Sequence, residues 1–451
     1  MKTDLRTAEV DPRLKLNIDD NEFFQQRILS RPEDIARSVT PSKNSHKLLN
    51  AAATIAEEHV HSIVKALHGN DQVNRLIDWV EFVANEATVI MVKVPDYINA
   101  FTMFETLNDR GLRIAQSDLL KNYLFDKAGA DVSAVHPKWA MMTGALESVG
   151  DHDITVDFIR HYWITRHGPT RERELSDKIK HAVNTRQKAV DFATALSRSA
   201  NDYVALLNPH HEKWNDYGNS TRKHITTINH HLRVWQIRPL MLAVALHFPV
   251  EEGKKAFKML VCWSVRFLVS GGRGGLLDRN YAVAAQEAGS GKIKTAQELY
   301  DKMVGILPND AAFAAAFANA KVSKNYLARY YLRALEMKVK DDSSPELIPN
   351  DDEEVVNLEH VLPENPSADW NVNQQTASAL FRAIGNMVLL KADINAKIGN
   401  APFDQKKQHY AKSGFALTAE VAKSQKWGME QIIQRQKRLS MVAVETWPLA
   451  G

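Results

Sequence analysis

The residue types best suited to chemistry gather near the C-terminus of the chain. A Glu–His pair, Glu359–His360, ends an apolar, β-branched run. Asn386 opens a second apolar run, Asn395 follows nine residues later, and Lys397 comes two residues after that. A histidine at the end of a strand can act as a general base, because its pKa lies near neutrality. A carboxylate and an amide oxygen suit a hard cation such as Mg²⁺, which prefers oxygen ligands.

This ordered set suits the hydrolysis of a phosphodiester bond, which needs a base for water, neutralised phosphate charge and a stabilised leaving oxygen. Each member alone has an ordinary structural explanation. A lone histidine after a strand is usually structural, Gly385–Asn386 is a common turn, and Asn395 is a plausible helix-start residue. The order of the whole set therefore carries the prediction, with Asn386 as an orienting residue and Lys397 reaching a phosphate.

Two strands and a helix are expected to position these side chains. A helix that follows a hairpin would bring Asn395 next to His360, although 35 residues separate them in the sequence. Asp393 is a plausible cap for that helix, and Thr418 is the expected N-cap of a long terminal helix. The predicted elements are a strand over 355–359, a helix over 374–383, a strand over 386–390 and the terminal helix over 417–442.

Helical periodicity dominates the rest of the chain. Apolar residues recur at steps of three and four over 45–67 and 74–85, and helices are expected through most of 156–337. The run over 88–94 is short and β-branched, ends before a proline, and is expected to form a buried strand. An acidic linker is expected over 341–353.

Composition limits the classes of protein that are possible. At 451 residues the chain is expected to hold two or three domains, and a net charge of +3 excludes a uniformly basic nucleic-acid coat. The single cysteine, Cys262, excludes an intrachain disulfide and favours a reducing, cytoplasmic setting. The N-terminus has no apolar signal region, and no stretch is long and apolar enough to predict a membrane span.

Charge is uneven near the C-terminus. Eight Lys or Arg residues lie between 403 and 440, opposed by three acidic residues. Such a run is usually a solvated helix face, but it would also suit a surface that follows nucleic-acid phosphates. The sequence leaves both interpretations open until the helix faces are known.

Two C-terminal segments resemble a known nuclease family. The segments Leu358–Glu364 and Ile384–Leu390, followed by Asn395–Lys397, look like the C-terminal His-Me finger (HNH) domain of the GmrSD restriction endonucleases. The resemblance implies that His360 is the general base and that Glu359 and Asn395 hold one divalent metal, Mg²⁺ or Mn²⁺. The acidic position is Glu here, where many relatives have Asp. We expect Lys397, Lys406 and Lys407 to hold DNA phosphates.

An upstream segment supports the same resemblance. Residues 100–114, which include the turn Asn108–Gly111, and residues 117–122 resemble the end of the family's N-terminal ParB-like domain. The Tyr-Gln-Arg and Asp-Gly-Gln-Gln-Arg motifs that the family uses for nucleotide handling are not in the sequence. We therefore expect a truncated gene, a split system with a second chain supplying the missing half, or a mis-set start. Autonomous nucleoside-triphosphate hydrolysis is not expected.

These observations predict a mainly α fold with a short remnant α/β segment at the N-terminal side and a C-terminal ββα nuclease module. The predicted parts are a partial ParB-like domain (1–130), a helical middle domain (131–340), the acidic linker (341–353) and the finger domain (354–451). The predicted function is metal-dependent DNA cleavage in a bacterial restriction or anti-phage system. The alternative is a non-catalytic binding subunit or remnant that needs a partner chain. An RNA target is a third possibility, although no single-strand stacking motif favours it.

Overall fold

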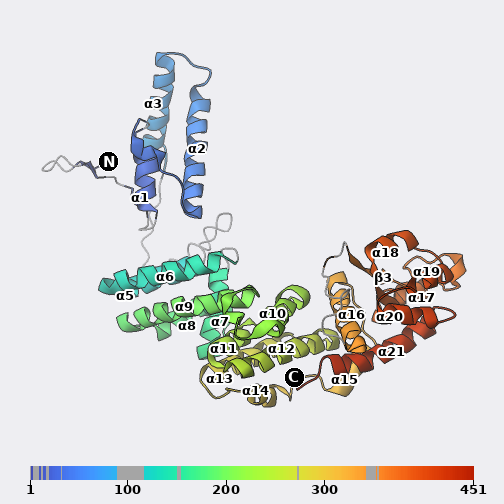
Figure 1. Cartoon of the computed structure of the whole chain (residues 1–451). Helices are drawn as coiled ribbons and strands as arrows, with labels where there is room; N and C mark the ends of the chain where they lie inside the picture. The colour runs from blue at the N-terminus through green and yellow to red at the C-terminus, as the bar shows by residue number, and fades with distance from the viewer. Residues whose placement is uncertain are drawn as a thin grey trace. The chain divides into compact units, whose positions relative to one another are not determined.

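A computed structural model gives the arrangement of the chain, and Figure 1 labels its elements. It describes residues 2–3, 10–11, 14–16, 20–31, 33–88, 116–149, 154–271, 274–341, 352 and 355–450. The described part is mainly α-helical, as the sequence predicts. Most of the strand predicted over 88–94, the turn Asn108–Gly111 and most of the acidic linker over 341–353 lie outside the described residues. The chain divides into two compact units, Met1–Gly111 and Leu112–Gly451.

The first unit is built around a helical hairpin. The helices predicted over 45–67 and 74–85 are confirmed as α2 and α3, which lie side by side (Figure 1). Many of their large apolar side chains are exposed, from Leu48 on α2 to Phe82 on α3. The elements of this unit are β1 (Lys2–Thr3), β2 (Val10–Asp11), α1 (Asn21–Phe24), the π-helix η1 (Gln25–Leu29), the 3-10 helix η2 (Ile35–Ser38), α2 (Asn44–Val64) and α3 (Asn70–Asn85).

The second unit begins with a helical body whose apolar faces are buried against one another. Cys262 is buried on α12, as expected for a small core residue. The elements are α5 (Gln116–Ala128), η3 (Gly129–Asp131), α6 (Val132–Glu147), α7 (Ile154–His167), α8 (Glu172–Ala182), α9 (Arg186–Leu207), η4 (Glu212–Trp214), α10 (Gly218–Thr226), η5 (Thr227–Leu232), α11 (Arg238–His247), α12 (Val250–Ser270), α13 (Gly274–Gly289), α14 (Ala296–Met303), α15 (Asp310–Phe317) and α16 (Asn325–Lys340).

A two-stranded antiparallel sheet follows the helical body. The two predicted strands are confirmed with a shift of one residue, and α18 follows the second strand directly. The elements are β3 (Val356–His360), η6 (Ala368–Trp370), α17 (Gln374–Leu380), η7 (Ile384–Asn386), β4 (Met387–Lys391), α18 (Ala392–Ile398), α19 (Phe403–Tyr410), α20 (Ala416–Ala419), η8 (Glu420–Lys423) and α21 (Met429–Thr446).

The helical body shares a hydrophobic core with part of the C-terminal elements, which also form a second hydrophobic cluster of their own. Helix α21 packs against α15 and α16, and α16 also contacts β4. Trp447, just after α21, lies among the rings of Phe313, Phe317 and Tyr331. The Nε of buried Arg266, on α12, donates to the carbonyl of Trp447 at 2.7 Å. The sheet is therefore held on a helical platform that begins well before it in the sequence.

The single terminal helix predicted over 417–442 is wrong, because the chain breaks between η8 and α21. Thr418 does not cap a helix, and its hydroxyl donates to the carbonyl of Leu389 at 2.6 Å. The indole of Trp427 is buried, and its N–H donates to Asn386 at 3.2 Å. Gly428 then adopts an extended conformation before α21 begins. These contacts with distant residues outweigh the helical periodicity of the local sequence.

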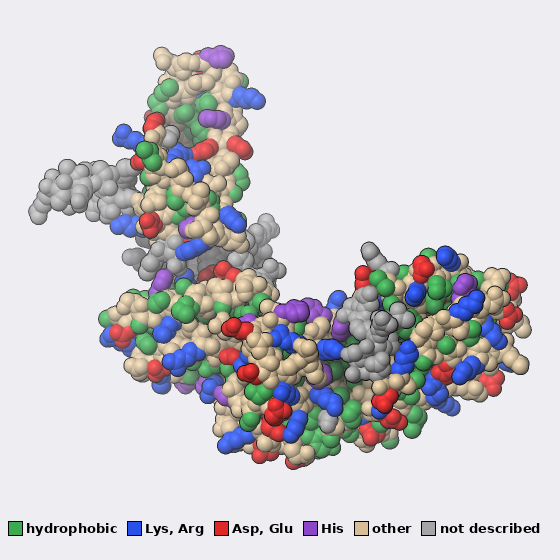
Figure 2. All heavy atoms as spheres, viewed as in Figure 1, with side chains coloured by type: hydrophobic (Ala, Val, Ile, Leu, Met, Phe, Trp, Pro, Cys, Tyr) green, Lys and Arg blue, Asp and Glu red, His purple; other side chains and the backbone are tan. Residues whose placement is uncertain are grey.

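No helix in the described ranges is long and apolar enough to cross a membrane. Figure 2 shows Lys and Arg side chains interspersed with Asp and Glu over the visible face of the second unit. This mixture matches the small net charge of the chain. This visible face carries no extended surface of one charge sign.

Candidate active site

The antiparallel hairpin places the end of β3 beside the start of β4. His360 pairs with Met387 and Glu359 with Val388 in the strand register. The N–H of Val361, one residue beyond β3, donates to the carbonyl of Asn386 at 2.9 Å. The two segments that the sequence singles out are therefore adjacent in space, although the loop between them is long.

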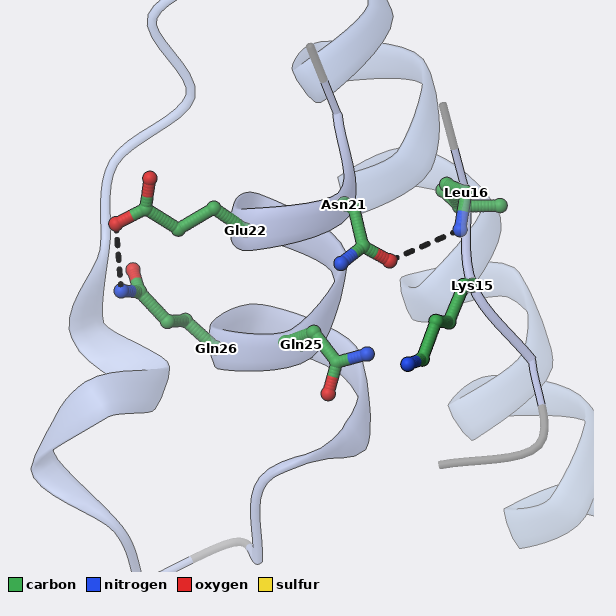
Figure 3. A pocket seen from close by; sticks show the side chains of 6 residues that line it. All are labelled: Lys15, Leu16, Asn21, Glu22, Gln25 and Gln26. Atoms are coloured by element: carbon green, nitrogen blue, oxygen red, sulfur yellow. Dashed lines mark hydrogen bonds between the residues drawn. The ribbon is translucent and has the colours of Figure 1, made fainter. Parts of the chain in front are cut away.

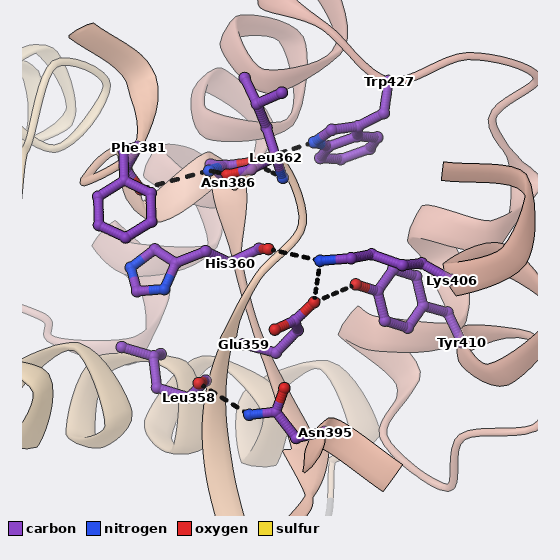
Figure 4. Close-up of polar contacts among 10 residues, drawn as sticks. All are labelled: Leu358, Glu359, His360, Leu362, Phe381, Asn386, Asn395, Lys406, Tyr410 and Trp427. Atoms are coloured by element: carbon purple, nitrogen blue, oxygen red, sulfur yellow. Dashed lines mark hydrogen bonds and ion pairs between the residues drawn. The ribbon is translucent and has the colours of Figure 1, made fainter. Parts of the chain in front are cut away.

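Asn386 closes that loop with its side chain. Its Oδ1 accepts from the backbone N–H of Leu362 at 2.8 Å, and its Nδ2 donates to the carbonyl of the same residue at 2.9 Å. The amide also donates to the carbonyl of Phe381 at 3.3 Å and accepts from the Trp427 indole (Figure 4). The residue is completely buried. This geometry suits the orienting role predicted for Asn386, and it leaves no access for a substrate.

His360 is half-buried at the end of β3, and its imidazole stacks on the ring of Phe381. The ring centroids are 3.9 Å apart and the planes differ by 16°. Burial, together with the smaller effect of the positive charges of Lys406 and Arg382, lowers the pKa of His360 to about 4. The imidazole is therefore neutral at pH 7, which is the protonation state that a general base needs.

Glu359 lies on the opposite side of the strand from His360, because successive side chains of a strand alternate. Figure 4 shows its carboxylate directed at Lys406 and Tyr410, whereas the imidazole of His360 turns toward Phe381. The carboxylate accepts from the Lys406 ammonium and from the Tyr410 hydroxyl, both at 2.7 Å. Burial raises the pKa of Glu359, and its bonds with Lys406 and Tyr410 oppose that rise.

The prediction that Lys406 binds a DNA phosphate is wrong. Its side chain is 1% exposed, and its ammonium also donates to the carbonyl of His360 at 3.2 Å. The reason is helix phase, since Phe403, Lys406 and Tyr410 share the buried face of α19. An ammonium enclosed in this way cannot reach a phosphate from solvent.

The remaining predicted site residues lie around this pair. Nδ2 of Asn395, on α18, donates to the carbonyl of Leu358 at 3.3 Å, so α18 is bound to β3 one residue before Glu359. Lys397 is exposed on α18. The ammonium of Lys407 donates to the carbonyl of Ser424 at 2.8 Å and so helps to hold the break before α21. Among these lysines, Lys397 has the exposure that a phosphate contact requires.

A divalent metal held by Glu359 does not fit this donor set. One oxygen of that carboxylate, Oε1, already accepts from an ammonium and a hydroxyl in the protein interior. Within the described ranges, no group of three or more His, Cys, Asp or Glu residues is placed to hold a metal ion. Asn395 reaches the strand through its amide nitrogen, on the Glu359 side of the sheet rather than beside the imidazole (Figure 4).

Comparison with known families gives the identity of this region. Residues 307–442 match the family described as GmrSD restriction endonucleases, C-terminal domain. The C-terminal part of the chain belongs to this family. The match spans α15 and α16 as well as the β3–β4 sheet, in agreement with the core that these elements share. No curated protein matches the chain. The match does not extend to residues 1–130, so the ParB-like assignment of that segment stays a prediction.

Sequence reasoning missed a buried arginine that holds the GmrSD domain together. The guanidinium of Arg435, on α21, donates to the carbonyls of Gly385 at 2.8 Å, Met387 at 2.9 Å and Leu417 at 3.1 Å. Gln436 beside it accepts from the N–H of Gly385 at 3.0 Å. The basic run thus includes a structural arginine, and its spacing with buried Ile432 and Leu439 is the signal that could have revealed this.

The structure adds two residues of the GmrSD domain to the site that the sequence did not single out. Phe381 supplies the ring on which His360 stacks, and Arg382 follows it as an exposed cation. The carbonyl of Arg382 accepts from the N–H of Val322 at 2.9 Å, so this segment is fixed to the helical platform. In the sequence they lie in the last turn of the helix predicted over 374–383, which ends at Leu380 in the structure.

A separate shallow groove lies in the first unit (Figure 3). It is lined by Lys15, Leu16, Asn21, Glu22, Gln25 and Gln26. Asn21 accepts from the N–H of Leu16 at 2.9 Å, and Gln26 donates to Glu22 at 3.3 Å. These bonds lie within α1, η1 and the segment before them, and they do not assemble a base or a nucleophile. The groove therefore adds nothing to the chemistry of the GmrSD domain.

Proposed function

We propose that this chain is a DNA endonuclease of a bacterial restriction or anti-phage system and that His360 activates the attacking water. The observation that supports the proposal is the GmrSD C-terminal domain match together with a neutral, half-buried imidazole at the end of β3. We propose further that the β3–β4 sheet and α18 form the ββα core of a His-Me finger. In this core, the side chain of Asn386 holds the loop that follows His360 through two hydrogen bonds with Leu362.

The proposed reaction is a single displacement at phosphorus. Water gives a proton to His360 as its oxygen bonds to phosphorus. The bond from phosphorus to the leaving sugar oxygen breaks, and that oxygen takes a proton from solvent water. Lys397 and Arg382, which are both exposed, are the proposed phosphate contacts. Mg²⁺ or Mn²⁺ stays part of the proposal, because restriction nucleases generally use such an ion to neutralise phosphate charge. We assign no step to it, since Glu359 does not fit as its ligand.

A plasmid nicking assay tests this function on the purified full chain. Supercoiled plasmid and several modified DNAs are incubated with Mg²⁺, with Mn²⁺ and with EDTA. We expect nicking of at least one DNA, loss of nicking in EDTA and recovery when the metal is returned in excess. Undiminished nicking in EDTA would remove the metal from the proposal, and intact DNA under every condition would remove the nuclease assignment itself.

The acid limb of the pH–rate profile is expected to lie unusually low. kcat/KM reports the pKa of the free enzyme's base. Because burial holds the pKa of His360 at about 4, kcat/KM should stay high at pH 6 and fall as the pH drops through about 4. If the base were a histidine with an ordinary pKa, kcat/KM would fall as the pH drops through about 6.5. A limb centred near 6.5 in protein that is still folded would contradict the proposed environment of His360.

That profile needs a folding control, because other histidines also titrate. Burial lowers the pKa of His224 to about 4 and the pKa of His161 well below its usual value. The unfolded state then binds more protons than the folded state, so stability is present above pH 6.5 and falls as the pH decreases toward 4. Tryptophan fluorescence at each pH would separate unfolding from protonation of His360.

A second candidate function is a binding subunit that works with a partner chain. The observation that favours it is the set of exposed apolar side chains on the α2–α3 hairpin, including Ile55, Val80 and Phe82. Such surfaces commonly mark contacts with another protein. The two candidates differ in the nicking assay: a pure chain that cleaves DNA alone excludes the subunit role. A chain that cleaves nothing and gives no heat with Mg²⁺ in calorimetry favours it.

A further inference from the structure

The interior of the GmrSD domain contains an ion pair whose two charges are almost completely enclosed. The Lys406 ammonium and the Glu359 carboxylate are 2.7 Å apart, and their side chains are 1% and 8% exposed. The hydroxyl of Tyr410, a residue with no exposed surface, donates to the same carboxylate oxygen at 2.7 Å. Buried charges are costly unless they are paired and hydrogen-bonded, and each partner here meets both conditions.

The ammonium also contacts the strand that carries the proposed base. Lys406 Nζ donates to the carbonyl of His360 at 3.2 Å (Figure 4). It also lies 5.8 Å from the centre of the Trp370 ring. One side chain of α19 thus joins the acid on β3, the backbone at the end of β3 and an aromatic ring from the following loop. The imidazole of His360 is itself free of the pair and stacks on Phe381.

Ligation of a metal by Glu359 would disturb this arrangement. A divalent ion at the carboxylate would lie close to an ammonium that cannot move into solvent, and like charges at such a distance repel strongly in a buried site. Release of the carboxylate would also leave the Tyr410 hydroxyl without its acceptor and the ammonium with the carbonyl of His360 alone. The donor set therefore serves an internal cation already present in the chain.

We propose that Glu359 is the counter-charge of Lys406 rather than a metal ligand, and that the pair, closed by Tyr410, fixes the backbone of His360. Glu359, Lys406 and Tyr410 are positioning residues in this assignment. For its effect on activity the proposal rests on the nuclease function of the chain. Its effect on stability does not depend on that function.

A charge-neutral double variant tests the proposal in the full chain. Lys406→Met leaves a buried carboxylate without its cation, and Glu359→Gln leaves a buried ammonium without its anion. We expect each single variant to lower the melting temperature by several degrees and to lower nicking by about tenfold or more. The double variant Glu359→Gln/Lys406→Met removes both charges at once. It should recover most of the melting temperature, whereas nicking should stay about tenfold below the wild type, because the bond from Lys406 to the carbonyl of His360 is lost.

The controls separate the possible outcomes. Lys412→Met, which removes an exposed lysine just after α19, should leave both readouts unchanged. The assignment is overturned if Glu359→Gln and the double variant both melt like the wild type and neither nicks DNA, since that result identifies Glu359 as a ligand. Equal destabilisation by the double variant and by the sum of the single variants also overturns it. If the wild type itself does not nick, the melting temperatures still decide whether the two charges are coupled.

Discussion

Replacing His360 with alanine is expected to reduce plasmid nicking by about 10²–10⁴-fold, the usual contribution of a general base. The imidazole is half-buried against Phe381 and makes no hydrogen bond within the core network of Glu359, Lys406 and Tyr410. Its loss should therefore leave the fold intact, so that the effect appears in kcat rather than in the amount of folded protein. The measurement is the initial rate of conversion of supercoiled to open-circular plasmid.

A matched control is available in the same domain. His409 is exposed on α19, and His409→Ala should nick at the rate of the wild type. His360→Asn keeps a polar side chain of similar size but cannot accept a proton near neutral pH, so it should be as inactive as the alanine variant. Nicking by His360→Ala at the wild-type rate, after purification that removes host nucleases, would refute the role of His360 and would shift attention to the binding-subunit alternative.

Much of the backbone architecture was predictable because its signals are local. The β-branched run over 355–359 and the apolar run over 386–390 became β3 and β4 with a shift of one residue. The three- and four-residue apolar steps over 45–67 became α2. The spacing of apolar residues alone is enough to predict such elements when no contact with a distant residue opposes it. The break before α21 was not predictable in this way, since it depends on Trp427 reaching Asn386, 41 residues away in sequence.

The direction of each site residue was harder to predict than its position. The types Glu, His and Asn at their spacing indicated one shared centre, but strand alternation places Glu359 and His360 on opposite sides of β3. The partner of Glu359 is Lys406, 47 residues further along the chain. Lys406 falls in phase with Phe403 and Tyr410 on α19, so its burial was readable, whereas its acidic partner required the tertiary fold.

The buried arginine of α21 gives the largest expected effect on stability. Arg435→Met removes a guanidinium that donates to three carbonyls in two segments, those of Gly385 and Met387 at the start of β4 and that of Leu417. An unsatisfied buried acceptor costs about 1–3 kcal/mol, so we expect a loss of about 3–5 kcal/mol, reduced where water can enter. The stability of Arg435→Lys should lie between that of the wild type and that of Arg435→Met. One ammonium cannot reproduce a planar guanidinium that reaches both the start of β4 and the carbonyl of Leu417.

Hydrogen exchange over residues 384–391 measures this loss where it arises. Protection of those amides reports the free energy of local opening, which is more informative than one melting temperature for a chain with two compact units. Lys437→Met, an exposed lysine on the same helix, should change protection by less than about 0.5 kcal/mol. Unchanged protection in Arg435→Met would show that the guanidinium bonds do not hold the start of β4.

The variants of His360 and Arg435 should also differ in whether nicking and amide protection change together. The carbonyls of Gly385 and Met387, which accept from Arg435, flank Asn386. The side chain of Asn386 in turn accepts from the N–H of Leu362, two residues after His360. Loosening the arginine should therefore free the backbone that positions the base, so that nicking and local protection decline together in Arg435→Met and Arg435→Lys. His360→Ala should lose nicking with protection unchanged. A variant of Arg435 that loses protection but keeps full activity would mean that the position of the His360 imidazole does not depend on the hydrogen bonds of Arg435 and Asn386.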